Sequence, residues 1–125
     1  MSVLTQEIQA CLSPVTGNGQ DGFSTRIAFP TEFVGFKGHF PGRPVLPGVC
    51  LIQTAVVALS RALNQPVELK RLVSAKWMAP VLPGEEIALS LSIKDLENSL
   101  MGVRVTVTRG GGKVAEFSLA VLVAP

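Results

Sequence analysis

The feature that most constrains this chain is a proline-rich loop that runs directly into an apolar helix. Residues 38–48 read Gly-His-Phe-Pro-Gly-Arg-Pro-Val-Leu-Pro-Gly. Each of the three prolines fixes φ and removes a backbone donor, so regular structure cannot form there. Nothing breaks a helix over residues 49–63, which are apolar on nearly every face. A helix of this kind belongs in the middle of a domain, so the sequence predicts a stiff loop followed by a buried central helix.

Two polar side chains stand out in this stretch. His39 is the only histidine of the chain, and Gln53 follows fourteen positions later, a little over one turn into the helix. A buried amide without a partner costs about 1–3 kcal/mol, so Gln53 either pairs with the loop backbone or faces a polar cleft. The first amides of the helix, those of Gly48 and Val49, have no intrahelical acceptor and can receive a carbonyl, a carboxylate or an oxyanion.

The rest of the chain is dominated by strand patterns. Residues 2–10 are compatible with a short helix capped by Ser2, and Gly- and Asn-rich residues 17–22 predict a turn. After Pro66 the apolar residues recur with period two, and turns at 97–99 and 110–112 separate the last segments. Joined by hairpins, these segments predict an antiparallel sheet wrapped around the helix, an α+β arrangement. The predicted strands are 11–15, 23–29, 67–77, 87–93, 103–107 and 115–123.

Length and composition narrow the class of protein. At 125 residues we expect a single domain, 1–125, and 47% apolar against 16% charged residues predicts much buried surface, including a subunit interface of a homodimer or an assembly of dimers. The net charge of +2, without aromatic-basic interleaving, argues against nucleic-acid binding. Cys11 and Cys50 are too few for a disulfide framework, and neither a leader nor a membrane span is evident, which indicates a cytoplasmic protein. One histidine and two distant cysteines predict no metal site and no cofactor.

Residues 38–49 resemble the hallmark of the β-hydroxyacyl-acyl-carrier-protein dehydratases, which is Gly-His-Phe-Pro, two residues, Pro, two residues and Pro-Gly-Val before a central helix. A second feature of that family, Pro-Val-x-Pro-Gly followed by an acidic residue, recurs at residues 80–85. The resemblance implies the hotdog fold, with a sheet around one buried helix and a site at the dimer interface. It also implies a thioester substrate carried by acyl carrier protein or coenzyme A. At position 53, where that family has glutamate or aspartate, this chain has glutamine.

The chemistry implied by the resemblance assigns a role to each candidate residue. His39 suits a general base, because the unperturbed pKa of histidine lies near neutral pH. The N–H groups of Gly48 and Val49 would stabilise the enolate oxygen, and Gln53 would orient the leaving hydroxyl. The side chains expected to contact the acyl chain are Phe36, Phe40 and Val56. Each of them is also compatible with a place in the hydrophobic core.

Three functions are consistent with these residues. The first is a dehydratase-like lyase acting on 3-hydroxyacyl thioesters, as the loop motif indicates. The second is a hotdog acyl thioesterase, in which the helix amide positions a hydrolytic water. The third is a catalytically silent subunit of a dehydratase heterodimer, whose partner supplies the missing acid. The amide of Gln53 favours the second and third.

Overall fold

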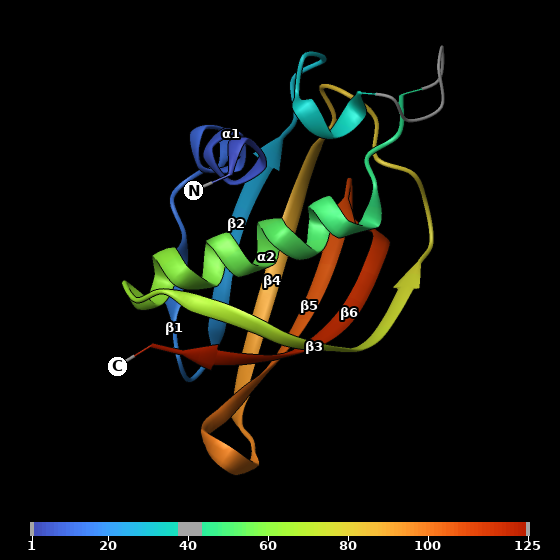
Figure 1. The fold of residues 1–125 in the computed structure, drawn as a ribbon. Helices are drawn as coiled ribbons and strands as arrows, with labels where there is room; N and C mark the ends of the chain where they lie inside the picture. The colour runs from blue at the N-terminus through green and yellow to red at the C-terminus, as the bar shows by residue number, and fades with distance from the viewer. Residues whose placement is uncertain (1, 38–43, 125) are drawn as a thin grey trace.

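The computed structural model describes residues 2–37 and 44–124, which form an antiparallel sheet curved around a long helix (Figure 1). A shorter helix packs beside the long one. This is the α+β arrangement that the sequence predicts. In chain order the elements are α1 (Val3–Cys11), β1 (Thr16–Asn18), β2 (Gly22–Ala28), η1 (Val34–Phe36), α2 (Gly48–Leu63), β3 (Val67–Trp77), β4 (Glu86–Asp95), η2 (Glu97–Ser99), β5 (Leu100–Arg109) and β6 (Gly112–Val123).

The central helix α2 confirms the predicted buried helix and begins one residue earlier, at Gly48. Its N-cap is Pro47, whose side chain makes no capping hydrogen bond to the helix amides. Its C-cap is Asn64, which adopts the left-handed conformation (φ 53°) and donates its N–H back to the last turn. Asparagine tolerates this conformation better than most residues. The buried side chains of α2 are Cys50, Leu51, Ile52, Thr54, Ala55, Val56, Val57, Ala58 and Leu59.

The strands lie in the order β1-β2-β4-β5-β6-β3, and every neighbouring pair is antiparallel. The prediction that the last four strands are joined by successive hairpins is therefore wrong for β3, which crosses the sheet and pairs with β6. The connection from β3 to β4 contains Pro80, Pro83 and Gly84, and a tight hairpin cannot accommodate so long and proline-rich a segment. The hairpins β4-β5 and β5-β6 are confirmed.

Alternation along the strands places one apolar face against α2, as predicted. Successive side chains of a strand point to opposite faces, so every second residue enters the core. The buried residues on this inner face include Ile87, Leu89, Leu91, Val103, Val105, Val107, Ala115, Phe117, Leu119 and Val121.

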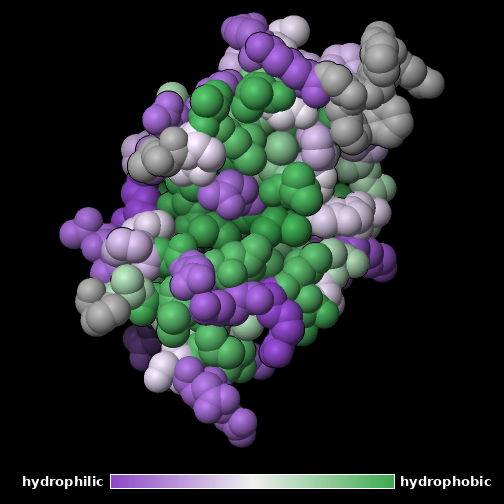
Figure 2. Space-filling model, viewed as in Figure 1, coloured by the Kyte–Doolittle hydropathy of each residue, from purple (hydrophilic) through white to green (hydrophobic). Residues whose placement is uncertain are grey.

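Strand β3 departs from this simple alternation. Register shifts fall between Leu69 and Arg71 and between Leu72 and Ser74, so Arg71 lies opposite Ala120 and Leu72 lies opposite the core residue Leu119. These bulges interrupt the strict period-two alternation that the sequence predicts after Pro66. At the edge of the sheet, β3 leaves several hydrophobic side chains exposed. Figure 2 shows hydrophobic side chains gathered on the face where α2 and β3 lie.

The N-terminal segment differs from the prediction at two elements. The first is strand β1 (Thr16–Asn18), which overlaps the turn predicted over residues 17–22. Residues 11–15 do not form a strand, because α1 continues to Cys11 and its apolar face, with Ile8 and Leu12 buried, packs into the core. The helix cap at Ser2 is confirmed by its side chain, which accepts a hydrogen bond from the Thr5 amide. Among residues 2–37 and 44–124, no helix is long and apolar enough to cross a membrane.

Candidate active site

The start of α2, at Gly48, contains the two backbone amides that the sequence analysis assigned to the enolate oxygen. Within the helix start the Cys50 amide already donates to the Pro47 carbonyl, at 2.9 Å. The amides of Gly48 and Val49 precede this bond, and the Val49 side chain is 68% exposed. The helix dipole adds partial positive charge at this end. These two amides are therefore suited to hold an oxygen that gains negative charge.

A pocket of about 300 Å³ adjoins this helix start. The indole of Trp77, the last residue of β3, packs directly over Gly48: a Cβ at that glycine would lie 2.8 Å from the Trp77 Cζ2 atom. Trp77 also packs against Phe117, with ring centroids 5.6 Å apart, and is 48% exposed. The residues that line the pocket are Val45, Leu46, Gly48, Leu51, Trp77, Met78, Ala79, Pro80 and Val81.

Trp77 was not among the site residues that the sequence analysis named. In the sequence analysis it is placed only within the strand predicted over residues 67–77. The available signal was its location, since the only tryptophan of the chain stands three positions before the motif of residues 80–85. The approach of this strand to the helix start depends on the curvature of the sheet, which the motif alone does not indicate.

Gln53 lies one turn further along α2 and is paired. Its Nε2 atom donates a hydrogen bond to the Thr5 Oγ1 atom of α1, at 3.1 Å, in a partly buried setting. The partner is thus a side chain of another helix. In the sequence analysis, the loop backbone was considered as the partner of Gln53. The Nε2 end of the amide therefore has a partner within this chain, which offsets the cost of burying that group.

Two further polar contacts dock α1 onto the rest of the chain. The guanidinium of Arg61, on α2, donates to the Leu12 and Gln9 carbonyls at 3.2 and 3.1 Å. The Glu7 carboxylate accepts a hydrogen bond from the Val34 amide at 3.0 Å. The position of α1 therefore does not depend on Gln53 alone.

The predicted substrate-lining residues lie in the core of this chain where the structure describes them. Phe36 is buried and meets Phe33 edge to face, with ring centroids 5.9 Å apart. Val56 is buried in α2. Neither lines the pocket beside Gly48, so their contact with substrate stays a prediction. His39 and Phe40 lie outside the described residues.

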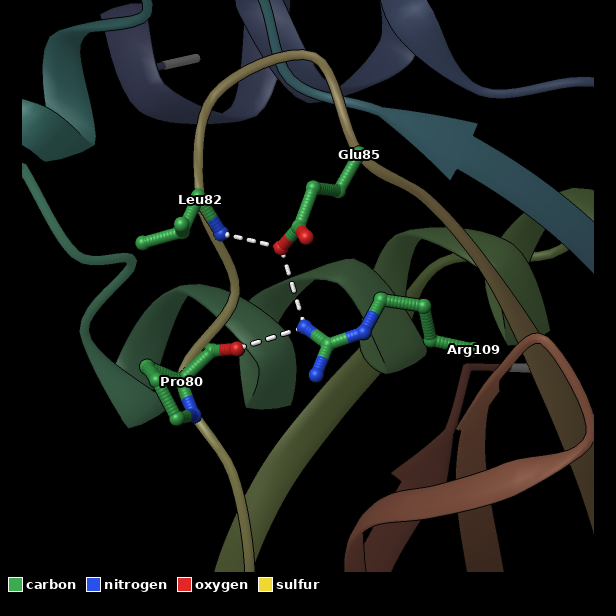
Figure 3. Close-up of polar contacts among 4 residues, drawn as sticks. All are labelled: Pro80, Leu82, Glu85 and Arg109. Carbon is green, nitrogen blue, oxygen red and sulfur yellow. Dashed lines mark hydrogen bonds and ion pairs between the residues drawn. The ribbon is translucent and has the colours of Figure 1, made fainter.

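The segment between β3 and β4 forms one wall of the pocket and is held by an ion pair (Figure 3). The Arg109 Nη1 atom donates to the Pro80 carbonyl at 2.6 Å and to Glu85 Oε1 at 2.9 Å. The same carboxylate oxygen accepts from the Leu82 amide at 2.8 Å. Gly84, at φ 81°, makes the turn that brings the carboxylate back, a conformation that favours glycine.

The two cysteine thiols are unsuited to act as nucleophiles. Burial raises the pKa of the Cys50 thiol, and burial together with the charge of Glu7 raises the pKa of Cys11, so both remain protonated and weakly nucleophilic at neutral pH. In the part of the chain that the structure describes, no group of three or more His, Cys, Asp or Glu side chains is placed to hold a metal ion.

A curved antiparallel sheet around one buried helix is the hotdog fold, and solved structures agree. The chain is similar to the dehydratase heterocomplex ApeI:P from Xenorhabdus doucetiae, with a TM-score of 0.71 and 19% identity over 89% of this chain and 96% of that chain. It is also similar to a variant of the fluoroacetyl-CoA-specific thioesterase FlK, with a TM-score of 0.68 and 13% identity over 87% of this chain and 89% of that one. At these identities the likeness defines the fold and not the activity.

Residues 16–116 match the model of the ApeI-like family, described as ApeI dehydratase, and the chain belongs to this family. Among curated relatives, the 3-hydroxyacyl-[acyl-carrier-protein] dehydratase FabZ of a Caulobacter species is 34% identical over 102 residues, which cover 72% of this chain and 62% of the relative. FabZ of Myxococcus xanthus is 31% identical over 90 residues, which cover 65% of this chain and 59% of that protein. The chain spans about three fifths of the length of these relatives.

Proposed function

We propose that this chain is a dehydratase-like lyase that removes water from 3-hydroxyacyl thioesters of acyl carrier protein. The observation that carries the proposal is the match of residues 16–116 to a dehydratase family, because this region contains the loop motif, the helix start and the pocket beside it. The curated FabZ relatives support the same class of substrate. Coenzyme A thioesters offer the same acyl chemistry and are an alternative carrier.

In the proposed reaction one side chain transfers the proton and two backbone amides stabilise the developing charge. His39 takes the proton from C2, and the electron pair moves into the thioester carbonyl, whose oxygen becomes an enolate oxygen. The Gly48 and Val49 amides donate to that oxygen, work that in comparable sites amounts to about 3–4 kcal/mol per donor. The C3–O bond then breaks as the C2–C3 double bond forms. The leaving hydroxyl takes the proton from His39 and departs as water.

Gln53 alters this scheme at one point. An amide cannot deliver a proton, so in the proposed mechanism Gln53 orients the leaving hydroxyl while His39 serves as base and then as acid. General acid assistance contributes roughly 10²–10⁴-fold, so the reaction proceeds without the carboxyl at a reduced rate.

We also propose that the chain forms a homodimer, or an assembly of dimers, through β3. This strand is at the end of the strand order, and an edge strand exposes backbone donors and acceptors that natural proteins cover or pair. Its exposed hydrophobic side chains point to a second copy of this chain as the cover. In such a dimer the resemblance implies that His39 and Gln53 of one site come from opposite subunits. The exposed hydrophobic residues of β3 are Leu69, Leu72, Val73 and Trp77.

A second candidate function is supported by Gln53 together with one structural neighbour. The neighbour from Xenorhabdus doucetiae is a dehydratase heterocomplex of two components. A chain that lacks the helix carboxyl would suit the role of a silent subunit, paired with a dehydratase subunit that supplies the acid. In that case this chain alone would show no turnover, and the mixture with its partner would be active.

The test is to incubate the purified chain with a 3-hydroxyacyl-acyl-carrier-protein thioester and to follow enoyl thioester and free thiol by mass spectrometry. We expect enoyl product, and we expect His39→Ala to abolish it, because no other histidine can replace the base. Free thiol without enoyl product would identify a thioesterase. The absence of both products, with well-folded protein, would contradict the lyase proposal for the isolated chain.

A further inference from the structure

The ion pair between Arg109 and Glu85 differs from an ordinary surface salt bridge, because both of its members also bind backbone. One nitrogen of Arg109, Nη1, carries two hydrogens, and its two acceptors are the Pro80 carbonyl and the Glu85 carboxylate. The carboxylate in turn receives the Leu82 amide. Both side chains are about two-thirds buried, with 32% and 34% of their surfaces exposed. The pair therefore fixes the path of the main chain from Pro80 to Glu85, as Figure 3 shows.

A backbone hydrogen bond connects this segment to the residues just before α2. Val81 follows Pro80, whose carbonyl accepts the hydrogen bond from Arg109, and is fully buried. Its own carbonyl accepts from the Leu46 amide at 2.9 Å, and Leu46 directly precedes the N-cap of α2. A short covalent and hydrogen-bonded path thus links Arg109 to Pro47 and to the amides that follow it.

The same residues line the pocket beside the helix start. Pro80 and Val81 form one side of it, and Leu46 and Gly48 form another. A shift of the segment that holds Pro80 would therefore change both the shape of the pocket and the direction of the helix amides. Misplacement of catalytic groups by about 1 Å lowers rates by as much as ~10²-fold.

We propose that Arg109 is a positioning residue of the active site. It holds the Pro80–Val81 wall of the pocket and, through the bond between Leu46 and Val81, it orients the amides of Gly48 and Val49 toward the thioester oxygen. This inference rests on the proposed dehydratase function. It adds to that function a residue at the far end of β5, which does not touch the substrate.

The chain offers a matched control in the ion pair between Arg26 and Glu86. The Arg26 Nη1 atom lies 3.0 Å from Glu86 Oε1, a separation like that of the Arg109 pair, but the two side chains are 67% and 60% exposed. Exposed pairs of this kind contribute little, and in the described residues Arg26 makes no side-chain hydrogen bond to a backbone carbonyl. Removal of its charge tests the effect of losing an arginine without disturbing the pocket wall.

The experiment compares Arg109→Met, Arg109→Lys and Arg26→Met in the full chain, with kcat and KM for 3-hydroxyacyl-acyl-carrier-protein. Arg109→Met is expected to lower kcat by ~10–100-fold, because the amides act mainly in the transition state, with a smaller change in KM from the altered pocket wall. Arg109→Lys should recover much of the loss, since an ammonium can still donate to the Glu85 carboxylate and the Pro80 carbonyl. Arg26→Met should match the parent.

Amide hydrogen exchange at Leu46 supplies a readout that does not need activity. The exchange rate should rise in Arg109→Met and not in Arg26→Met. If the parent chain lacks dehydratase activity, the proposed function fails, while faster exchange at Leu46 still supports the positioning role. Should Arg109→Met not fold, Glu85→Gln replaces it, with a smaller expected loss of kcat.

Three results would overturn the inference. The first is parental kcat and parental Leu46 exchange in a folded Arg109→Met protein. The second is an equal loss of kcat in Arg26→Met, which would indicate a general charge effect. The third is an equal loss of kcat in Arg109→Lys and Arg109→Met. An ammonium that still donates to Glu85 and Pro80 should restore part of kcat.

Discussion

Replacement of Gly48 by alanine probes the contact between the helix start and Trp77. Built on the present backbone, the new Cβ would lie 2.8, 3.0 and 3.1 Å from three atoms of the indole, closer than van der Waals contact allows. The ring is also packed against Phe117, so it cannot retreat toward the sheet without displacing a core side chain. Overpacking of this kind costs about 1–3 kcal/mol.

An opposing term comes from helix propensity. Alanine is better than glycine within a helix by about 0.5–1 kcal/mol, and position 48 is the first residue of α2. The steric term is the larger of the two, so we expect Gly48→Ala to destabilise the protein by about 1–2 kcal/mol net. With the indole removed in Trp77→Ala, only the propensity term remains, and the same change should stabilise by up to about 1 kcal/mol.

The assay is urea unfolding followed by circular dichroism for all four members of the double-mutant cycle. One protein concentration must be used throughout, because the unfolding of an oligomer depends on concentration. Gly19→Ala is the control, since its Cβ would meet only the Ile93 Cδ1 atom, at 3.9 Å, and its effect should stay within about 0.5 kcal/mol. An effect of Gly48→Ala with the same sign in both backgrounds would refute the reasoning.

Two further predictions follow from the proposed function. Gln53→Glu should raise enoyl formation by up to ~10²–10⁴-fold, because it restores an acid near the leaving hydroxyl. The Thr5 hydroxyl can donate to the new carboxylate instead of accepting from the amide, so α1 should stay docked. If the folded variant forms enoyl product at the parental rate or more slowly, the lyase proposal is rejected. Leu72→Arg, on β3, should convert dimers to monomers in sedimentation, while Leu82→Arg, at a similarly exposed leucine off that strand (42% against 44%), should leave them intact. A parent chain that sediments as a stable monomer at micromolar concentration contradicts the dimer.

The sequence predicted the elements whose information is local. The helix over residues 49–63 follows from an unbroken apolar run after Pro47, and the strands around Leu89, Val105 and Leu119 follow from period-two alternation. Both signals depend on residues a few positions apart, because backbone geometry repeats at 3.6 or 2 residues. The approximate start of α2 follows in the same way from where the proline-rich loop ends and the apolar run begins.

Tertiary structure alone decided which distant residues meet. No local pattern indicated that β3 would pair with β6, or that Gln53 would bind Thr5 of α1, 48 positions away. Nor did any pattern indicate that Arg109 would donate to the Pro80 carbonyl. The sequence also did not reveal that the bulged strand β3 would bring Trp77 over Gly48. Each of these contacts depends on how the whole sheet curves around α2 to bury its apolar face, a sum over many packing interactions that no short window of sequence contains.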